Sequence, residues 1–102
     1  MSVTKRKPVT PGEMLTEEFL TPLGLTQGQL AEAMGVPRKH VNEICNGRRS
    51  VTVATALLLA KAFGTSADFW LNCQRRTDLW EALHSRDVQS KLDKVKPLNE
   101  AA

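Results

Sequence analysis

Several side chains of the types that contact nucleic acid fall within twelve residues of this sequence. They include Arg38, Lys39, Asn42, Arg48 and Arg49. Arginine and lysine neutralise phosphates, and arginine, lysine and asparagine also form hydrogen bonds with base edges in a major groove. Glu43 is the only acidic residue between positions 38 and 49. This local positive charge favours a polyanionic partner more strongly than the net charge of +3 for the whole chain does.

The segment from residue 25 to residue 47 has the pattern of a helix-turn-helix, and such a motif would position those side chains. Thr26 is a suitable N-cap, and Gln29 completes a capping box three residues later. Gly35 supplies the positive φ that a helix end and a tight turn require. Apolar residues recur at helical spacing on both sides of the turn. They are Leu30, Ala31 and Met34 before it and Val41, Ile44 and Cys45 after it.

The second helix of the motif is expected to have Pro37 in its first turn and to stop at Asn46-Gly47. Its polar side would enter a major groove while the first helix crosses the sugar-phosphate backbone. We expect the second helix to read base edges, Gln27 to hold the backbone, and the arginines after Gly47 to neutralise phosphates. The predicted DNA-binding residues are Gln27, Arg38, Lys39, His40, Asn42, Arg48 and Arg49. The alternative is an ordinary helical hairpin whose polar face is only solvated.

Helices on both sides of the motif would supply its core. The run Thr10-Pro11-Gly12-Glu13 favours a helix from about 11 to 20, which Pro22 ends. Thr52 is a suitable N-cap for a second supporting helix, VATALLLAKAF, which Gly64 closes. This run is too apolar for a surface helix, so we expect its large side chains to be buried beneath the motif. They are Leu57, Leu58, Leu59, Ala60 and Phe63.

The C-terminal third holds both tryptophans and carries more large apolar side chains than the core of one small subunit needs. Ser66 can cap a further helix with a candidate interruption at Arg75-Arg76-Thr77, and a weaker apolar stripe continues through 88–95. We therefore expect a dimer interface formed by Leu79, Trp80 and Leu83. Trp70 has two open interpretations: it closes the core of the monomer, or it joins that interface.

With 102 residues, 41% of them hydrophobic, the chain has room for one modest core. We expect a flexible basic arm at 1–9, a helix-turn-helix domain with dimerising C-terminal helices at 10–85, and a variable tail at 86–102 that is partly helical or disordered. The arm either contacts DNA or solubilises the terminus. The sequence contains no long apolar run and no signal-peptide pattern, which favours a cytoplasmic protein.

Other kinds of site have weak support. Cys45 and Cys73 lack a CxxC spacing and have only two histidines as possible partners, which favours reduced thiols over a metal site. The sequence has no glycine-rich phosphate loop, no Cys-His or Ser-His-Asp grouping and no cluster of carboxylates, so we expect neither catalysis nor a cofactor. A protein-binding module that uses the helix-turn-helix only as a scaffold is a competing interpretation.

The sequence resembles the HigA antitoxins, a group of the XRE-type helix-turn-helix superfamily that includes plasmid-maintenance antidote proteins. The resemblance covers about residues 8–83 and rests on short motifs spread along the chain. They are Pro11-Gly12-Glu13, Phe19-Leu20, Pro22-Leu23-Gly24, Leu30-Ala31, Gly35-Val36-Pro37-Arg38, Asn46-Gly47, Ala56-Leu57, Leu59-Ala60, Phe69-Trp70-Leu71-Asn72 with Gln74, and Asp78-Leu79-Trp80. Many relatives in the superfamily have Ser or Thr before the recognition helix where this chain has Pro37, so a hydroxyl cap and phosphate contact is missing here.

The resemblance implies an all-α, five-helix, lambda-repressor-like helix-turn-helix domain with a C-terminal helical extension. It also implies a homodimer that represses its own operon at an imperfectly palindromic DNA operator and neutralises a HigB-like toxin that cleaves mRNA. A solitary XRE-type repressor without a toxin partner shares the same pattern and is the alternative.

Overall fold

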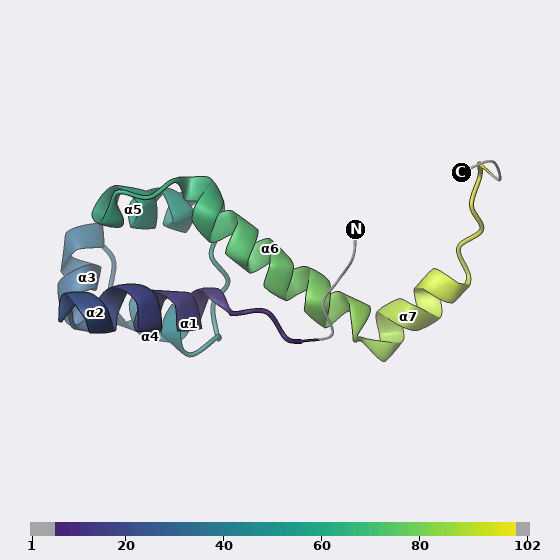
Figure 1. Cartoon of the computed structure of the whole chain (residues 1–102), viewed down its shortest axis with the longest axis horizontal. Coiled ribbons are helices and arrows are strands. Elements are labelled where there is room, and N and C mark those ends of the chain that lie inside the picture. The colour runs from purple at the N-terminus through teal and green to yellow at the C-terminus, as the bar shows by residue number, and fades with distance from the viewer. Residues whose placement is uncertain (1–5, 100–102) are drawn as a thin grey trace.

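The computed structural model describes residues 6–99, and every regular element in that range is a helix (Figure 1). The first helix is a continuous run of three parts, α1 (Pro11–Leu15), the π-helical η1 (Thr16–Leu20) and α2 (Thr21–Leu23). The others are α3 (Gln27–Met34), α4 (Arg38–Cys45), α5 (Val53–Phe63), α6 (Ala67–Leu83) and α7 (Arg86–Asp93). The predicted all-α, five-helix domain with a C-terminal helical extension is confirmed.

The N-terminal helix begins as predicted but ends later. The Thr10 side chain accepts a hydrogen bond from the Glu13 amide, and the Glu13 carboxylate accepts one from the Thr10 amide. The helix then continues through Pro22 to residue 23, so the predicted end near residue 20 is wrong. A proline ring inside a regular α-helix collides with the carbonyl four residues earlier. The wider π-helical turn, in which the Thr21 amide donates to the Thr16 carbonyl, accommodates the ring.

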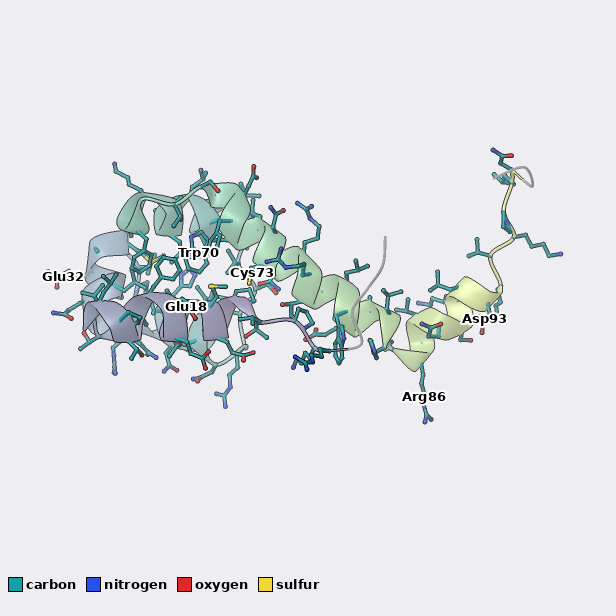
Figure 2. The ribbon with its side chains drawn as sticks, in the orientation of Figure 1. Glu18, Glu32, Trp70, Cys73, Arg86 and Asp93 are labelled. Carbon is teal, nitrogen blue, oxygen red and sulfur yellow. The ribbon has the colours of Figure 1, made fainter. Side chains whose placement is uncertain are left out.

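The core is centred on Trp70. This side chain is fully buried, and its indole N–H donates to Thr65 Oγ1 at 2.8 Å. Three phenylalanines surround it, with ring centroids 5.0 Å (Phe19), 6.2 Å (Phe63) and 5.1 Å (Phe69) from that of the tryptophan. Figure 2 shows Trp70 in the space between the N-terminal helix and the start of α6. Of the two interpretations open from the sequence, Trp70 therefore closes the core of the monomer.

The helix α5 has the predicted bounds, with Thr52 as its N-cap, but the predicted burial of its large side chains is wrong in part. Leu59 is fully buried, whereas Leu57 is 57% exposed and Leu58 is 37% exposed. Successive residues of a helix point in different directions, so a core that lies on one side covers only part of an apolar run. The opposite side of α5 stays at the surface of the subunit.

The helix α6 is a single element of 17 residues, so the candidate interruption at Arg75-Arg76-Thr77 is absent. Thr77 is buried, and its hydroxyl donates to the Cys73 carbonyl one turn earlier, which satisfies it inside the helix. The apolar stripe farther along belongs to a separate helix, α7, for which Ser85 is the N-cap. Figure 1 shows the end of α6 and α7 leading away from the other helices, and the longest extent of the molecule is 53 Å.

The expected basic arm at 1–9 and tail at 86–102 lie only partly within the described residues. Positions 1–5, including Lys5, and positions 100–102 lie outside them. Residues 6–9 form no helix or strand, and the Val9 carbonyl accepts a hydrogen bond from the Cys73 thiol at 3.4 Å. Within residues 6–99, Cys45 and Cys73 are free thiols, and no group of His, Cys, Asp and Glu side chains is placed to hold a metal ion. No helix in the same range has the length and apolarity to cross a membrane.

Candidate DNA-binding site

The helices α3 and α4 pack together as the two helices of the predicted helix-turn-helix. Thr26 and Gln29 form the predicted capping box, with hydrogen bonds of 3.0 and 2.9 Å. Gly35, at a φ of 71°, ends α3, and Pro37 is the N-cap of α4. The expectation that Pro37 takes a position inside the first turn of α4 is therefore off by one residue. The buried apolar residues of the pair are Leu30, Ala31, Met34, Val41 and Ile44.

The N-terminal helix supports α4, the recognition helix, through a close backbone contact at Gly12. A Cβ atom at this position would overlap the carbonyl oxygen of Ile44 and lie 2.7 Å from that of Cys45. Only a residue without a side chain lets the first turn of α1 approach the last turn of α4 so closely. This contact holds the C-terminal end of the recognition helix against the body of the domain.

A row of side-chain hydrogen bonds crosses the outward surface of the motif. Asn46 Nδ2 donates to Asn42 Oδ1 at 3.1 Å, and Asn42 Nδ2 donates to Gln27 Oε1 at 3.0 Å. Each amide oxygen has a second lone pair, and each amide nitrogen has a second N–H. Asn42 therefore keeps one acceptor and one donor, which are the two groups that the N6 and N7 positions of adenine bind. The row restrains Asn42 and leaves its capacity for a bidentate contact with a base.

Arg38 and Lys39 are exposed in the first turn of α4. A Cβ atom at Gly28 would lie 3.9 Å from Cδ of Arg38, so the aliphatic part of this arginine passes beside the first turn of α3. Gln27 is the first residue of that turn. One surface therefore carries Arg38, Gln27 and Asn42. A site that reads bases and also holds the adjacent sugar-phosphate backbone requires such an arrangement.

His40 has a different environment from its neighbours on the recognition helix. It is half-buried, and its Nε2 lies 3.4 Å from Oγ1 of Thr55 in α5. Its ring faces the supporting helix, so among the residues that the sequence predicts for DNA binding on α4 it has the least access to a groove.

The two arginines after the recognition helix differ in their partners. Nη2 of Arg49 lies 2.8 Å from Oε1 of Glu43 in an ion pair. This hydrogen bond from Arg49 lowers the pKa of Glu43 from its ordinary value, so the carboxylate stays charged at neutral pH. Arg48 is exposed and forms no ion pair with another residue of the described range. Of the two guanidinium groups, that of Arg48 is the more available to a phosphate.

The loop that carries these arginines is fixed to α6. The Val51 amide donates to Gln74 Oε1 at 2.8 Å, and Gln74 Nε2 donates to Asp78 Oδ1 at 2.9 Å. Val51 itself is buried. The loop is therefore anchored to α6, which restricts where the two arginines can reach.

Three residues that shape the site do not follow from the sequence pattern used to predict it. They are Gly12, Asn46 and Gln74. Asn46 had a local signal, because it lies four residues after Asn42 and residues at that spacing share a helical face. The other two act on partners more than twenty residues away in the chain, and no local pattern indicates such contacts.

Comparison with known proteins agrees with this geometry. The helix-turn-helix family model HTH_3 matches residues 17–70, which include both helices of the motif. Antitoxin HigA-1 of Vibrio cholerae serotype O1 is 47% identical to this chain over 98 residues, which cover 96% of this chain and 90% of the relative. The chain belongs to the HigA family of helix-turn-helix proteins.

Two further proteins resemble this HigA-family chain over most of its length. The uncharacterised HTH-type transcriptional regulator YbaQ of Escherichia coli K12 is 41% identical over 100 residues, covering 98% of this chain and 88% of the relative. The structure of Pseudomonas aeruginosa antitoxin HigA with the higBA promoter superimposes with a TM-score of 0.82 at 34% identity, covering 90% of this chain and 99% of that one. The resemblance to HigA antitoxins is therefore confirmed.

Proposed function

We propose that this protein is a sequence-specific DNA-binding antitoxin that represses its own operon as a homodimer and neutralises a HigB-like toxin that cleaves mRNA. The observation that carries the DNA-binding part is the row of Gln27, Asn42 and Asn46 on the outward side of the recognition helix, beside Arg38. The solved complex of Pseudomonas aeruginosa HigA with its promoter supports the same conclusion. Such a repressor acts in the cytoplasm.

The proposed contacts divide into two groups. Asn42, Arg38 and Lys39 read base edges, because they lie at or near the N-terminal half of the recognition helix. The remaining predicted residues act on the sugar-phosphate backbone, and they are Gln27, His40, Arg48 and Arg49. His40 reaches a phosphate only by turning away from Thr55. Arg49 contacts a phosphate either while its guanidinium remains paired with Glu43 or after that ion pair breaks.

We further propose that the homodimer uses a surface on α6 formed by Leu79, Trp80 and Leu83. Leu79 is 37% exposed. The ring of Trp80 stacks on His84 with centroids 4.0 Å apart, and its buried indole N–H has no acceptor among the described residues. A second subunit at this surface removes the exposed part of these apolar side chains from water. Analytical ultracentrifugation of the Trp80→Ala, Leu83→Ala double variant tests this: we expect a folded monomer, and an unchanged dimer contradicts it.

The antitoxin part rests on the similarity to Antitoxin HigA-1. The test is co-expression of this protein with each open reading frame that flanks its gene, with cell growth and co-purification as readouts. We expect one neighbour to arrest growth alone, to be silenced by this protein, and to co-purify with it. If neither neighbour is toxic and neither co-purifies, the protein is a solitary repressor.

A solitary XRE-type repressor is the second candidate function. The observation in its favour is the 41% identity with YbaQ over nearly the whole chain, since YbaQ is described as a transcriptional regulator. Both candidates use the same DNA-binding surface, so only the search for a toxin separates them.

A further inference from the structure

A cavity of about 450 Å³ lies at the C-terminal end of the recognition helix, among segments that are far apart in the sequence. It is lined by the residues before α1, the first turn of α1, the end of α4 with the loop that follows, and the second half of α6. Proteins bind small molecules in cavities of about 300–1,000 Å³. The residues proposed to read bases do not line the cavity, so it is distinct from the base-reading surface.

Charged side chains of both signs line this cavity. The cationic ones come from the segment before α1 and from the loop after α4, and they are Lys7, Arg48 and Arg49. The acidic ones come from the first turn of α1 and from α6, and they are Glu13, Asp78 and Glu81. None of the six forms an ion pair with another of the six. The opposite charges of the cavity therefore do not neutralise one another.

Three of the six charged side chains have no partner in the described part of the chain. Lys7, Arg48 and Glu81 are exposed, and their side chains form no hydrogen bond or ion pair with another residue of the range 6–99. Hydrogen bonds already hold the other three, which are Glu13, Asp78 and Arg49. The free charged groups of the cavity are therefore two cations and one carboxylate.

The backbone that carries these free groups is held in place by α6. The segment with Lys7 is tied to this helix by the hydrogen bond from the Cys73 thiol to the Val9 carbonyl. The loop with Arg48 is tied to it through the Val51 amide. The helix itself carries the free carboxylate. Because these segments are held in advance, a ligand that bridges them loses less binding free energy to ordering the protein.

We propose that this cavity binds a small molecule of the basic amino-acid class and that the bound ligand weakens binding to the operator. The carboxylate of the ligand pairs with Arg48 and Lys7, since a guanidinium binds a carboxylate through two parallel hydrogen bonds. The guanidinium or ammonium group of the ligand pairs with Glu81 and with the Asp78 oxygen that does not accept from Gln74. Ligand binding is independent of the proposed function, whereas the effect on the operator rests on it.

The ligand and operator DNA compete for Arg48. Its guanidinium is proposed to neutralise a phosphate, and the same group binds the carboxylate of the ligand. A bound ligand therefore removes one phosphate contact and places a negative charge beside the DNA. The coupling is reciprocal, so operator DNA weakens ligand binding by the same factor.

Isothermal titration calorimetry of the full-length protein with L-arginine tests ligand binding in the absence of DNA. We expect a dissociation constant of about 1 mM or tighter. Agmatine lacks the carboxylate and glycine lacks the basic side chain, so each should bind about fivefold more weakly or worse. If the tripeptide glycyl-glycyl-arginine binds more tightly than L-arginine, the site takes the end of a peptide and the assignment to a free amino acid is overturned.

Variants locate the bound L-arginine. Glu81→Gln and Arg48→Gln should each weaken its binding about fivefold or more, with unchanged circular dichroism. The matched control is Glu18→Gln, which changes an exposed carboxylate of the N-terminal helix outside the cavity and should bind L-arginine like the wild type. Absence of binding, or binding that neither Glu81→Gln nor Arg48→Gln weakens, overturns the proposed site.

An anisotropy titration with operator DNA, in buffers of equal ionic strength, tests the regulation. Saturating L-arginine should weaken operator binding by the wild type about fivefold or more and leave that of Glu81→Gln unchanged. If L-arginine binds through Glu81 and Arg48 but operator affinity does not change, the regulatory part is overturned. A protein that binds L-arginine in this way but binds no DNA contradicts the proposed function and supports the ligand site.

Discussion

The side-chain amide of Asn42 donates to Oε1 of Gln27 at 3.0 Å, which joins the recognition helix to the first residue of α3. The residue proposed to read a base and the residue proposed to hold the backbone are therefore linked before DNA arrives. Asn46 extends this link by a second hydrogen bond to Asn42. Restraining a contact residue in advance lowers the entropy that binding costs.

The first prediction concerns this link. Asn42→Ala should weaken the free energy of binding to the operator by about 1–3 kcal/mol and relax the preference at one or two base pairs, because a base contact is lost. Gln27→Ala should weaken binding to all sequences, because a backbone contact is lost, and should also lower the preference for the operator, because Asn42 is then held by Asn46 alone. The double variant should lose less binding free energy than the sum of the losses in the two single variants, since each single change removes the same hydrogen bond. Anisotropy titrations of the three variants on operator and random duplexes measure the coupling, and strict additivity contradicts the linked arrangement.

The second prediction concerns Asn46. Asn46→Ala leaves Asn42 held on one side only, so preference for the operator over random DNA should fall while binding to random DNA stays unchanged. Asn46→Asp keeps an acceptor but loses the donor to Asn42, so it should behave like the alanine variant in preference and bind all DNA more weakly through its charge. Equal losses on both duplexes for Asn46→Ala would show that Asn46 only stabilises the helix end.

The third prediction concerns Glu43. Replacing it with glutamine removes a negative charge beside the phosphates and frees Arg49, so affinity for any duplex should rise severalfold and the salt dependence should steepen. Glu32→Gln, an exposed carboxylate in the last turns of α3, is the control and should change affinity less. Weaker binding by Glu43→Gln would mean that the ion pair aims Arg49 at the DNA.

Glu43 also gives a prediction for pH. Arg49 lowers the pKa of Glu43 in the folded protein, so the ion pair contributes its full stabilisation of the fold at any pH above the pKa that Glu43 has in the unfolded chain. This stabilisation is lost only as the pH falls through the lower pKa that Glu43 has in the folded protein. Between about pH 5 and 8 the carboxylate stays charged. The ratio of affinities of wild type and Glu43→Gln should therefore be constant over this range, and a ratio that changes near neutral pH contradicts the ion pair.

The fifth prediction uses two glycines with opposite surroundings. Gly12→Ala places a Cβ against the carbonyls of Ile44 and Cys45 and should destabilise the fold by about 1–3 kcal/mol or more. Gly28→Ala meets its nearest atoms at 3.8 and 3.9 Å, which is ordinary contact, and should stabilise the fold by up to about 1 kcal/mol through helix propensity. Urea unfolding of both variants checks the pair. Equal effects would contradict the close approach of α1 to α4.

The features that the sequence predicts well depend on neighbouring residues. The capping boxes at Thr10 and Thr26 require partners three residues away, and both form. The bounds of α5 follow from Thr52 and Gly64 in the same way. Such signals act through local geometry, so tertiary packing does not have to be known.

The features that the sequence predicts poorly depend on distant packing. Leu57 and Leu58 have the same character as Leu59, and only the position of the core decides that Leu59 alone is fully buried. Arg75-Arg76-Thr77 continues α6 because Thr77 is buried and bonded to Cys73. In the DNA-binding site, His40 turns to Thr55 and Arg49 to Glu43, contacts that a count of charges on a helical face does not contain.

The most direct test of the central claim, sequence-specific DNA binding by the recognition helix, is an anisotropy titration at several salt concentrations. It uses a duplex from the region upstream of the protein's own gene and a scrambled duplex of equal composition. We predict roughly a thousandfold preference or more for the upstream duplex. For a dimer that neutralises about six to eight phosphates, log affinity should fall with log salt at a slope of roughly −5 to −7. Asn42→Ala and Arg38→Ala should reduce the preference. Equal affinity for both duplexes, with a slope near zero, would contradict the account.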